Sequence, residues 1–343
     1  MEGITITLLF LKKQYTSRLT WPLAIKYNQV VDRLNLLRVI QNLMRQVAII
    51  GGGIIGLAIG YELSKHHTKF KISLFEKEKN LGKHQSGNNS GVLHCGLHYL
   101  PGSLKAKLAV DGIKRMISYC EENNINHDIC GKIVVPTNEK ELILLDDLAA
   151  RGFSNGLNGL KFITKSEIQK REPHLNSKKA LLVPEEGIVN YNEVIVSLSE
   201  KIKNKGGDIF LDNKVLGIFN QKFNKTVIKT QNLEKEFDVI INCTGLFSDR
   251  VYSSFTKKKS PIKIIPFRGE YMQMSDEYKH IVNHLIYPVP NPEYPFLGVH
   301  FTRTINGTRE VGPNAVFALK REGYKNSDIS LYDIIDSLSY KGL

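Results

Sequence analysis

The hydrophobic positions of the chain switch from a strand-like to a helix-like pattern and back between residues 47 and 76. The β-branched run VAII at 47–50 is typical of a buried parallel strand. The following LAIGYELSKHH, which begins at Leu57, has apolar residues at near-helical spacing. The run FKISLFE then ends at Glu76. This order of strand, helix and strand predicts the start of an α/β domain.

A glycine-rich motif, G-x-G-x-x-G, joins the first predicted strand to the helix. Gly51 permits a tight turn, Gly53 lets a pyrophosphate approach the backbone, and Gly56 lets helix and strand pack closely. The amides and positive dipole end of the helix would hold the diphosphate. Glu76, 20 residues beyond Gly56, is placed to accept hydrogen bonds from the ribose hydroxyls of an adenosine. The motif predicts a dinucleotide site, and by itself it does not separate FAD from NAD.

The segment at 84–109 favours FAD. It is rich in Gly, Ser and Asn but too apolar for a solvated loop. Its small residues would let the backbone run close to a bound planar group, and they are Ser86, Gly87, Ser90 and Gly91. Such a segment has no role in an NAD-dependent dehydrogenase. A later apolar run, at 237–251, predicts a buried strand that ends at Thr244 and Gly245 and approaches the same nucleotide.

Composition and charge restrict the class of protein. With 343 residues the chain is long enough for two domains. Its 42% hydrophobic and 24% charged residues are the balance of a globular protein, and no run reaches the roughly 18 apolar residues of a membrane-spanning helix. The net charge of +13 is dispersed, without interleaved aromatic residues. We therefore expect no nucleic-acid partner, and we expect the charge to attract small anionic substrates.

The cysteines predict neither a disulfide framework nor a zinc site. They form no CxxC pair and are Cys95, Cys120, Cys130 and Cys243. This spacing indicates a reducing compartment and no metal ligands.

Residues 1–45 differ from the rest of the chain. Their apolar run follows Glu2 and precedes Lys12, the reverse of the charge order in a signal peptide. Few acids and several basic residues are compatible with a mitochondrial transit peptide. The simpler interpretation is a poorly ordered or non-native extension, because Met44 immediately precedes the first strand. We exclude this extension from the fold prediction.

Several long stretches resemble the D-amino-acid-oxidase-like superfamily of FAD enzymes and, within it, the L-2-hydroxyglutarate oxidase/dehydrogenase family. The resemblance runs from about Val47 to Leu343. Its most specific stretches are HQSGNNSGVLHCGLHYLPGSLKAK, ICGKIVV, NCTGLFSDR, IIPFRGEYMQM, LIYPVPNPEYPFLGVHFTR and VGPNAVFALKREGY. It implies that the 2-hydroxy acid gives a hydride to flavin N5 and becomes 2-oxoglutarate. Electrons would leave to a quinone-type acceptor or oxygen.

The resemblance also implies which residues bind the cofactor. It implies that Gly51, Gly53 and Gly56 bind the pyrophosphate and that Glu76 binds the ribose. The flavin would lie along Ser86, Asn89, Ser90 and Gly91. The backbone of Val215 would contact the adenine, and Thr244 and Gly245 would close the nucleotide site. The chain departs from the common family pattern at Asn88, His98 and Thr244, where histidine, tyrosine and alanine are frequent. The departure at His98 bears on the substrate loop.

Removing a hydride from a hydroxy acid requires a base for the hydroxyl proton and cations for the carboxylates. His94, in the Gly-rich segment, is our candidate for the base or an active-site donor, and a core histidine bonded to backbone is the alternative. His300 and Arg303 lie in PFLGVHFTR, a predicted strand with one face toward a cavity. His300 is a second catalytic candidate, and Arg303 is either a carboxylate clamp or part of a surface ion pair.

Arg268 and Tyr271 are expected to line the same cavity as substrate-binding residues. For Arg268 the alternative is an inter-strand salt bridge with Glu270 or Glu310. Lys132 is a weaker candidate, because lysines at strand ends are usually solvated.

The predicted fold is α/β, with a Rossmann-like FAD-binding domain interleaved with a mixed-sheet α+β substrate domain. Strands around LIYPV, FLGVHF and TREVGPN are expected to form the mixed sheet. We assign 46–115 and 180–255 to the FAD-binding domain, 116–179 and 256–325 to the substrate domain, and 326–343 to a C-terminal segment. Because the resembling proteins continue for some tens of residues, this segment is expected to be truncated.

Alternative functions remain at this stage. A related flavin enzyme would oxidise glycerol 3-phosphate, an amino acid or another small hydroxy acid. An inactive fragment would fold without activity or would need a partner chain. We expect a cytoplasmic location, with peripheral association with the inner membrane left open, or a mitochondrial one if the extension is a transit peptide.

Overall fold

The computed structural model of the chain describes residues 44–220, 225–291 and 298–342. The predicted extension therefore lies outside the described residues, except for its last two positions. By contacts between residues the chain divides into two compact units. Residues 44–83 and 198–263 form what we call the glycine-loop unit, and residues 84–197 and 264–342 form what we call the sheet unit.

Each unit is built from two separate stretches of the chain, so the two units interleave in sequence. Residues 84–115 and 180–197 group with the sheet unit by contact, whereas we expected them in the FAD-binding domain. The expected domains were defined by the ligand that each one holds, so their boundaries stay a prediction.

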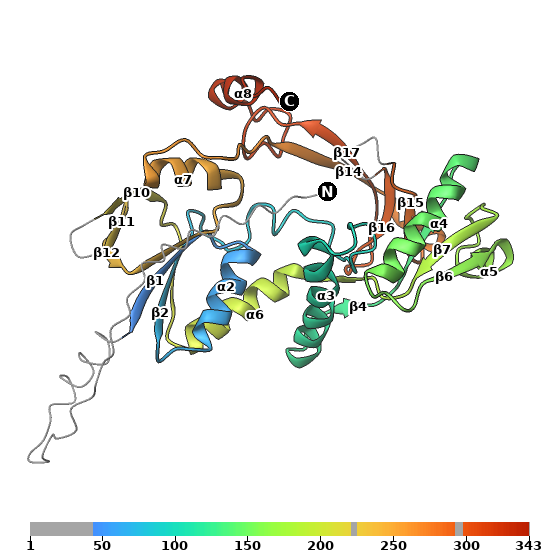
Figure 1. Cartoon of the computed structure of the whole chain (residues 1–343), viewed down its shortest axis with the longest axis horizontal. Coiled ribbons are helices and arrows are strands. Elements are labelled where there is room, and N and C mark those ends of the chain that lie inside the picture. Colours follow the sequence, from blue (N-terminus) through green and yellow to red (C-terminus); the bar gives the residue numbers. More distant parts are fainter. Residues whose placement is uncertain (1–43, 221–224, 292–297, 343) are drawn as a thin grey trace, which may run out of the picture. The chain divides into compact units, whose positions relative to one another are not determined.

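The glycine-loop unit contains a parallel four-stranded sheet in the order β13-β1-β2-β9. Its strands are β1 (Arg45–Ile50), β2 (Phe70–Phe75), β9 (Asp208–Phe210) and β13 (Val239–Asn242). Helix α2 (Ile54–Ser64) connects β1 to β2 (Figure 1), as parallel neighbours require. The predicted order of strand, helix and strand is confirmed.

A second, antiparallel sheet completes the core of this unit. It consists of β10 (Val215–Asn220), β11 (Thr226–Thr230) and β12 (Glu234–Phe237), and η2 (Gly245–Phe247) and α7 (Ser248–Thr256) follow β13. Phe75 stacks on Phe210, with ring centroids 5.1 Å apart, and meets the edge of Phe237 at 5.7 Å. These aromatic contacts join strands of the two sheets into one hydrophobic cluster.

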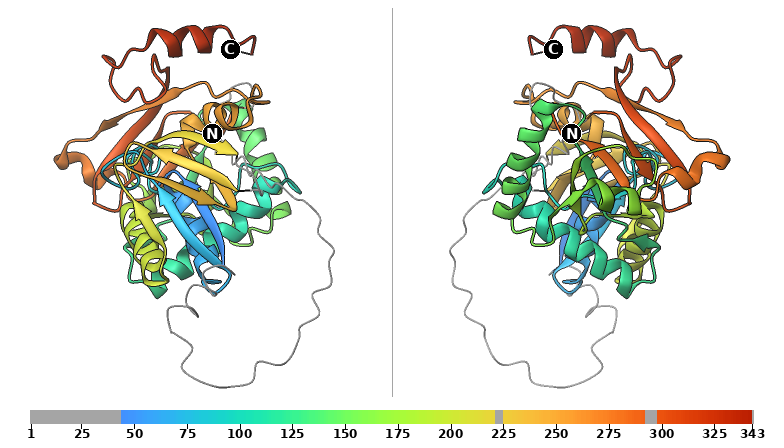
Figure 2. Two further views of the ribbon diagram at one scale, coloured as in Figure 1. Left: turned by 90° about the vertical axis from the view of Figure 1, so that its left-hand side faces the viewer. Right: turned by 90° about the vertical axis from the view of Figure 1, so that its right-hand side faces the viewer.

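The sheet unit is built on a seven-stranded mixed sheet in the order β14-β17-β16-β15-β5-β7-β6. The strands are β5 (Lys132–Val135), β6 (Lys161–Thr164), β7 (Lys179–Val183), β14 (Phe267–Gln273), β15 (Leu285–Pro288), β16 (His300–Arg303) and β17 (Arg309–Phe317). Only β15 and β5 pair in parallel among these neighbours. The mixed sheet expected from the sequence is confirmed. Figure 2 shows the orange and red strands β14 and β17 running side by side as a long ribbon.

A small antiparallel sheet and the remaining helices complete the sheet unit. These elements are β3 (Val92–Leu93), β4 (His127–Asp128), β8 (Gly187–Val189), α3 (Leu104–Glu122), α4 (Glu139–Ser154), α5 (Lys165–Arg171), η3 (Asp276–Ile281) and α8 (Leu331–Leu338). Helix α6 (Tyr191–Asn204) contains the boundary between the units. In the β3–β8 ladder, Val92 lies opposite Ile188 and Leu93 opposite Gly187. This register places the residues just beyond both strands, His94 and Glu186, next to each other.

Local sequence determines where several helices begin. The side chains of Ser103 and Asn138 accept hydrogen bonds from the first turns of α3 and α4, and Thr164 and Glu167 form a capping box at α5.

Among the helices of the described residues, none has the length and apolar composition that crossing a bilayer requires.

A buried carboxylate connects the end of α5 to β15. Glu172 has no solvent exposure. Its side chain accepts hydrogen bonds from the backbone N–H groups of Asn283 and His284 and lies 2.7 Å from His284 Nδ1. These donors satisfy a buried charge within the scaffold.

Candidate active site

The turn between β1 and α2 is held by backbone contacts with two neighbouring strands. The Gly51 N–H donates to Phe75 O at 2.8 Å, and the Cys243 N–H donates to Ile50 O at 2.8 Å. Gly51 has a φ of +110°, and a Cβ there would lie 2.2 Å from Cys243 O. Only glycine satisfies both constraints.

The beginning of α2 suits a diphosphate. A Cβ on Gly56 would lie 2.0 Å from Gly51 O, so the helix approaches the turn more closely than any side chain allows. Gly53 caps the helix without a side-chain hydrogen bond, and the first turn carries no acid. The positive end of the helix dipole is therefore left for an anion. These features of the described residues fit the phosphates of FAD, and contact with them stays a prediction for Gly51, Gly53 and Gly56.

Glu76 follows β2 and is buried. Its Oε2 accepts from the Gly52 N–H at 2.7 Å, and its Oε1 accepts from the Glu78 N–H at 2.9 Å. Each carboxylate oxygen can accept a further hydrogen bond, so contact with a ribose stays a prediction. The Asn213 N–H donates to Glu76 O, which connects Glu76 to the segment before Val215 at the start of β10.

Thr244 and Gly245 lie beyond β13, which ends at Asn242. The expectation that this strand ends at Thr244 and Gly245 was wrong, because the Asn242 side chain turns the backbone. Its Oδ1 accepts from the Thr244 hydroxyl at 2.6 Å, and its Nδ2 donates to Ser248 O. Thr244 still lies next to Gly51, since a Cβ on Gly51 would come 3.2 Å from Thr244 N, and Gly245 follows Thr244 in the sequence.

The flavin-side candidates lie in the sheet unit, in the turns before β3. Asn89 Nδ2 donates to Ser86 O, and Asn89 Oδ1 accepts from the Gly91 N–H at 2.7 Å. Ser90 lies between Asn89 and Gly91 in the sequence, and Gly91 has a φ of +70°. The segment is a compact turn held by Asn89, and contact of these four residues with flavin stays a prediction.

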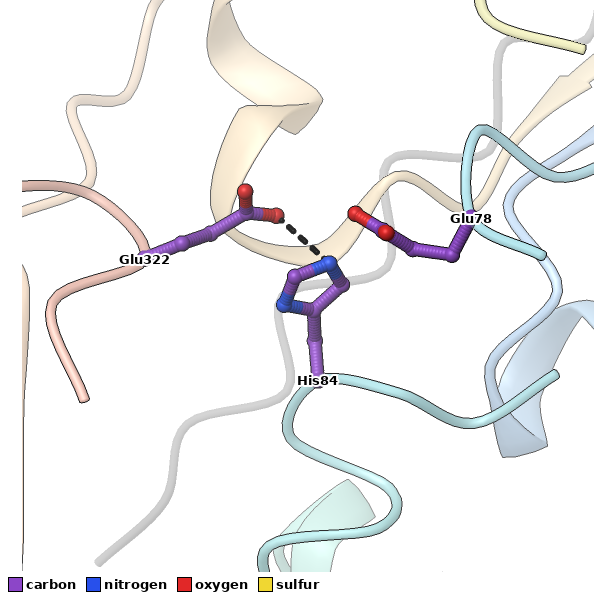
Figure 3. A group of neighbouring side chains, drawn as sticks. All are labelled: Glu78, His84 and Glu322. Carbon is purple, nitrogen blue, oxygen red and sulfur yellow. Dashed lines mark ion pairs between the residues drawn. The ribbon is translucent and has the colours of Figure 1, made fainter. Parts of the chain in front are cut away.

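The start of this segment is anchored within the sheet unit. Figure 3 shows the ion pair between His84 Nε2 and Glu322 Oε1, which lie 3.1 Å apart. The His84 ring also stacks on Tyr324, with centroids 5.9 Å apart.

A buried ion pair lies at the start of β5 in the sheet unit. Lys132 and Glu186 both have no solvent exposure, and 2.7 Å separates Nζ from Oε1. Burial acts to raise the pKa of Glu186, but the adjacent Lys132 ammonium and His94 ring outweigh it and hold that pKa well below its usual value. The expectation that Lys132 is solvated was wrong, because a carboxylate distant in sequence neutralises it.

Three further side chains surround this ion pair. His94 Nδ1 lies 3.3 Å from Glu186 Oε2, and the His94 side chain is 37% exposed. Lys132 Nζ lies 3.2 Å from His98 Nε2; burial and then the Lys132 charge hold the pKa of His98 well below its usual value. The Cys95 N–H and thiol point to Glu186 Oε1 at 3.3 and 3.2 Å, and burial raises the pKa of this thiol.

His300 stacks on Tyr287, with ring centroids 3.8 Å apart and planes 18° from parallel. Its Nδ1 lies 2.8 Å from Gly298 O, and burial lowers the pKa of His300 to about 4. The ring is therefore neutral at pH 7, with Nδ1–H donating and Nε2 left as an acceptor. Tyr287 also receives the edge of His94 at 6.3 Å, and Lys132 Nζ lies 5.1 Å from its ring centroid.

The structure thus brings three predicted site residues into one cluster. His94 and His300 both contact Tyr287, and Tyr271 meets His300 edge to face at 6.4 Å. The cluster combines a half-exposed imidazole beside a carboxylate with a neutral imidazole on an aromatic ring, which suits proton transfer from a hydroxyl.

The two predicted arginines make other contacts. Arg303 forms an ion pair with Asp128 at 2.7 Å. Arg268 pairs with Glu270 at 2.7 Å, and its guanidinium also donates to Gly323 O. The alternative of a salt bridge from Arg268 to Glu270 is therefore observed, but both residues belong to β14, so the expectation that it joins two strands was wrong. Contact of either arginine with substrate stays a prediction.

Sequence reasoning missed Glu186 and Tyr287. Glu186 stands in PEEG, which is typical of a solvated turn, and Tyr287 stands in an apolar strand. The pairing of β3 with β8 and of β15 with β5 brings both to His94 and Lys132. Burial of an acid between two apolar strands, β7 and β8, was the available signal.

The chain is similar to known FAD-dependent oxidoreductases in sequence and in fold. The chain matches the FAD dependent oxidoreductase family over residues 46–338. It is 46% identical to an L-2-hydroxyglutarate dehydrogenase of Indibacter alkaliphilus, over 87% of the chain and 74% of the relative. It is 42% identical to the mitochondrial L-2-hydroxyglutarate dehydrogenase of Nematostella vectensis, over 87% of the chain and 68% of the relative. Its fold is similar to FAD-bound L-alpha-glycerophosphate oxidase of Mycoplasma pneumoniae, with a TM-score of 0.75, 26% identity, and coverage of 86% and 78%.

Replacement of Gly56 by alanine should weaken flavin binding about ten- to hundred-fold, because overpacking costs about 1–3 kcal/mol and 1.4 kcal/mol is tenfold. The new Cβ would lie 2.0 Å from Gly51 O. Bound flavin is measured by absorbance after titration with FAD. The control is Gly112→Ala on α3, where a Cβ meets nothing within 4 Å. Equal FAD affinity of Gly56→Ala and wild type would contradict the prediction.

Acid should destabilise the protein through His300. The pKa of His300 falls from 6.5 in the unfolded chain to about 4 in the folded protein. The unfolded state therefore binds more protons between these values, and stability is lost as the pH falls from 6.5 toward 4. Between pH 7 and 5 the loss should be about 2 kcal/mol. In His300→Gln, urea denaturation at both pH values should show that much less pH dependence. If the stability of His300→Gln depended on pH as that of the wild type does, His300 would not be the cause of the loss of stability in acid.

Proposed function

The chain belongs to the FAD dependent oxidoreductase family, and from this premise we propose that it oxidises L-2-hydroxyglutarate to 2-oxoglutarate. The enzyme is a flavoprotein, and bound FAD supplies the acceptor for the hydride that leaves C2 of the substrate. The proposed substrate is supported by the relatives named L-2-hydroxyglutarate dehydrogenase.

The observation that carries the chemistry is the placement of His94 and His300 on Tyr287. His94 is the more exposed ring and lies beside the Glu186 carboxylate, so we assign it as the acceptor of the hydroxyl proton. His300 has a pKa of about 4 because it is buried, which makes it a weak base. We therefore assign the proton transfer to His94 alone, and to His300 the task of packing against Tyr287, on which the His94 ring also lies.

The two carboxylates of the substrate need cationic or donor partners. We assign one carboxylate to Arg303, whose guanidinium already pairs with the Asp128 carboxylate at 2.7 Å. An incoming carboxylate would compete with Asp128 for the same donors. Tyr271, whose ring lies 6.4 Å from that of His300, offers a phenol as a further donor. Arg268 is a weaker candidate, because it already contacts Glu270 and Gly323.

The electron acceptor and the location are part of the same proposal. We propose a quinone-type acceptor or oxygen, and peripheral contact with a membrane if the acceptor is a quinone. We propose a mitochondrial location in a eukaryote, as the name of the Nematostella vectensis relative states for that protein, and a cytoplasmic location in a bacterium.

A second candidate substrate is glycerol 3-phosphate. The fold similarity and the 26% identity to an L-alpha-glycerophosphate oxidase support it. Both substrates are small anionic alcohols, and the basic net charge of +13 attracts either one. They differ in the anion beside the hydroxyl, which is a carboxylate in one and a phosphate in the other.

Anaerobic addition of L-2-hydroxyglutarate should bleach the absorbance of the bound flavin within seconds, because the hydride reduces it. The matched controls are D-2-hydroxyglutarate, glycerol 3-phosphate and glycine at equal concentration. We expect 2-oxoglutarate in an amount equal to the flavin reduced. Bleaching by glycerol 3-phosphate, and not by L-2-hydroxyglutarate, would replace the proposed substrate with the second candidate.

Arg303→Ala should raise KM for L-2-hydroxyglutarate about ten- to hundred-fold, because a hydrogen bond to a charged group contributes about 1.5–3 kcal/mol. Flavin content should stay at the wild-type value. The control is Arg115→Ala, which removes an exposed ion pair with Asp111 on α3. A wild-type KM in steady-state assays of Arg303→Ala would remove this arginine from the clamp.

A further inference from the structure

Two buried polar atoms in the described part of the sheet unit face each other without an aligned hydrogen bond. They are His94 Nδ1 and Glu186 Oε2, which lie 3.3 Å apart. The β3–β8 register places both residues at the same end of the ladder. A small rotation of the ring would align the contact, as is usual for catalytic hydrogen bonds that tighten when substrate binds.

The other carboxylate oxygen of Glu186 is fully used. Oε1 receives the Lys132 ammonium at 2.7 Å, the Cys95 N–H at 3.3 Å and the Cys95 thiol at 3.2 Å. The backbone of Glu186 is also held, since the Gly131 N–H donates to Glu186 O at 2.8 Å. The carboxylate therefore cannot turn away from His94, and only Oε2 remains for the imidazole.

We propose that Glu186 is a positioning residue for His94, which holds the proton on Nδ1 and leaves Nε2 as the atom that accepts the proton of the substrate hydroxyl. Lys132 is the second part of this arrangement, because its ammonium, 2.7 Å away, keeps the Glu186 carboxylate ionised although that side chain has no solvent exposure. The identity of the hydroxyl substrate in this inference rests on the proposed function, whereas the arrangement of the three side chains does not.

The charges explain why this arrangement assists proton transfer. Before reaction, the charges of the Lys132 ammonium and the Glu186 carboxylate cancel each other. When Nε2 takes the hydroxyl proton, the new imidazolium lies beside the Glu186 carboxylate, which stabilises it. An imidazole with its proton on Nε2 would present a donor to the hydroxyl and could not accept its proton.

A second buried glutamate–histidine pair in the same unit offers a matched control. Glu172 has no exposure and lies 2.7 Å from His284 Nδ1. It accepts hydrogen bonds from the backbone N–H groups of Asn283 and His284. Its hydrogen bonds reach none of His94, His300, Tyr287 and Tyr271. Glu172→Gln therefore removes a buried carboxylate from a histidine without touching His94.

The ring tautomer of His94 tests the proposal without substrate. In FAD-loaded protein with ¹⁵N-labelled histidine, NMR should show wild-type His94 protonated on Nδ1, with the signal assigned from its loss in His94→Asn. Glu186→Gln should shift the ring toward the Nε2–H form, which free histidine side chains prefer in water. Glu172→Gln should leave the His94 tautomer unchanged. A wild-type ring protonated on Nε2 would overturn the proposal.

Flavin reduction in a single turnover gives the second measurement. Glu186→Gln should slow it about 100-fold, with flavin content unchanged, and Glu186→Asp should restore part of the rate because the charge is kept. Glu172→Gln should reduce its flavin at the wild-type rate. Wild-type rates in Glu186→Gln, or equal slowing in Glu172→Gln, would overturn the proposal.

Folding and substrate identity are separated by two further comparisons. If Glu186→Gln does not fold because Lys132 is left unpaired, the double variant Lys132→Met with Glu186→Gln removes both charges of this pair and should show the same tautomer shift and slow reduction. Wild-type behaviour of the double variant would overturn the proposal. Failure of L-2-hydroxyglutarate to reduce wild-type flavin would contradict the proposed substrate alone, since the tautomer is measured without it.

Discussion

An ammonium and a carboxylate without solvent exposure, those of Lys132 and Glu186, lie 2.7 Å apart in the sheet unit. Either charge alone would cost several kcal/mol in such a place, so the strands that carry them must meet in one register. Gly131 supports this register by bonding to Glu186 O. The same constraint brings His94 to the carboxylate and Tyr287 to the ammonium. The proposed chemistry depends on this pair, although neither partner is our proton acceptor.

The glycine-loop unit depends on a different constraint, which is the close approach of backbone to backbone. Cys243 O and Gly51 O occupy the positions that side chains on Gly51 and Gly56 would need. Glu76 then holds the turn through the Gly52 N–H. A turn without side chains, at the positive end of a helix whose N-cap residue is a glycine, is what a diphosphate requires.

The two buried glutamate–histidine pairs of the sheet unit show how similar contacts serve different purposes. Glu172 is satisfied by backbone N–H groups and by His284 within the scaffold. Glu186 is satisfied on one oxygen only, and its other oxygen faces a histidine that is 37% exposed. A carboxylate that leaves one buried oxygen for an accessible imidazole is suited to orient that imidazole.

The sequence by itself determined the order of strand, turn and helix from Arg45 to Phe75 and the individual strands of the mixed sheet, because these depend on local period and on glycine. It also indicated His94 and His300 as residues of one site. Only the tertiary structure decided that Lys132 is buried, that Glu186 is its partner and that Arg268 pairs with Glu270. The physical reason is that the burial and pairing of a charge depend on strands distant in sequence, and no local pattern distinguishes a solvated PEEG turn from one enclosed by a sheet.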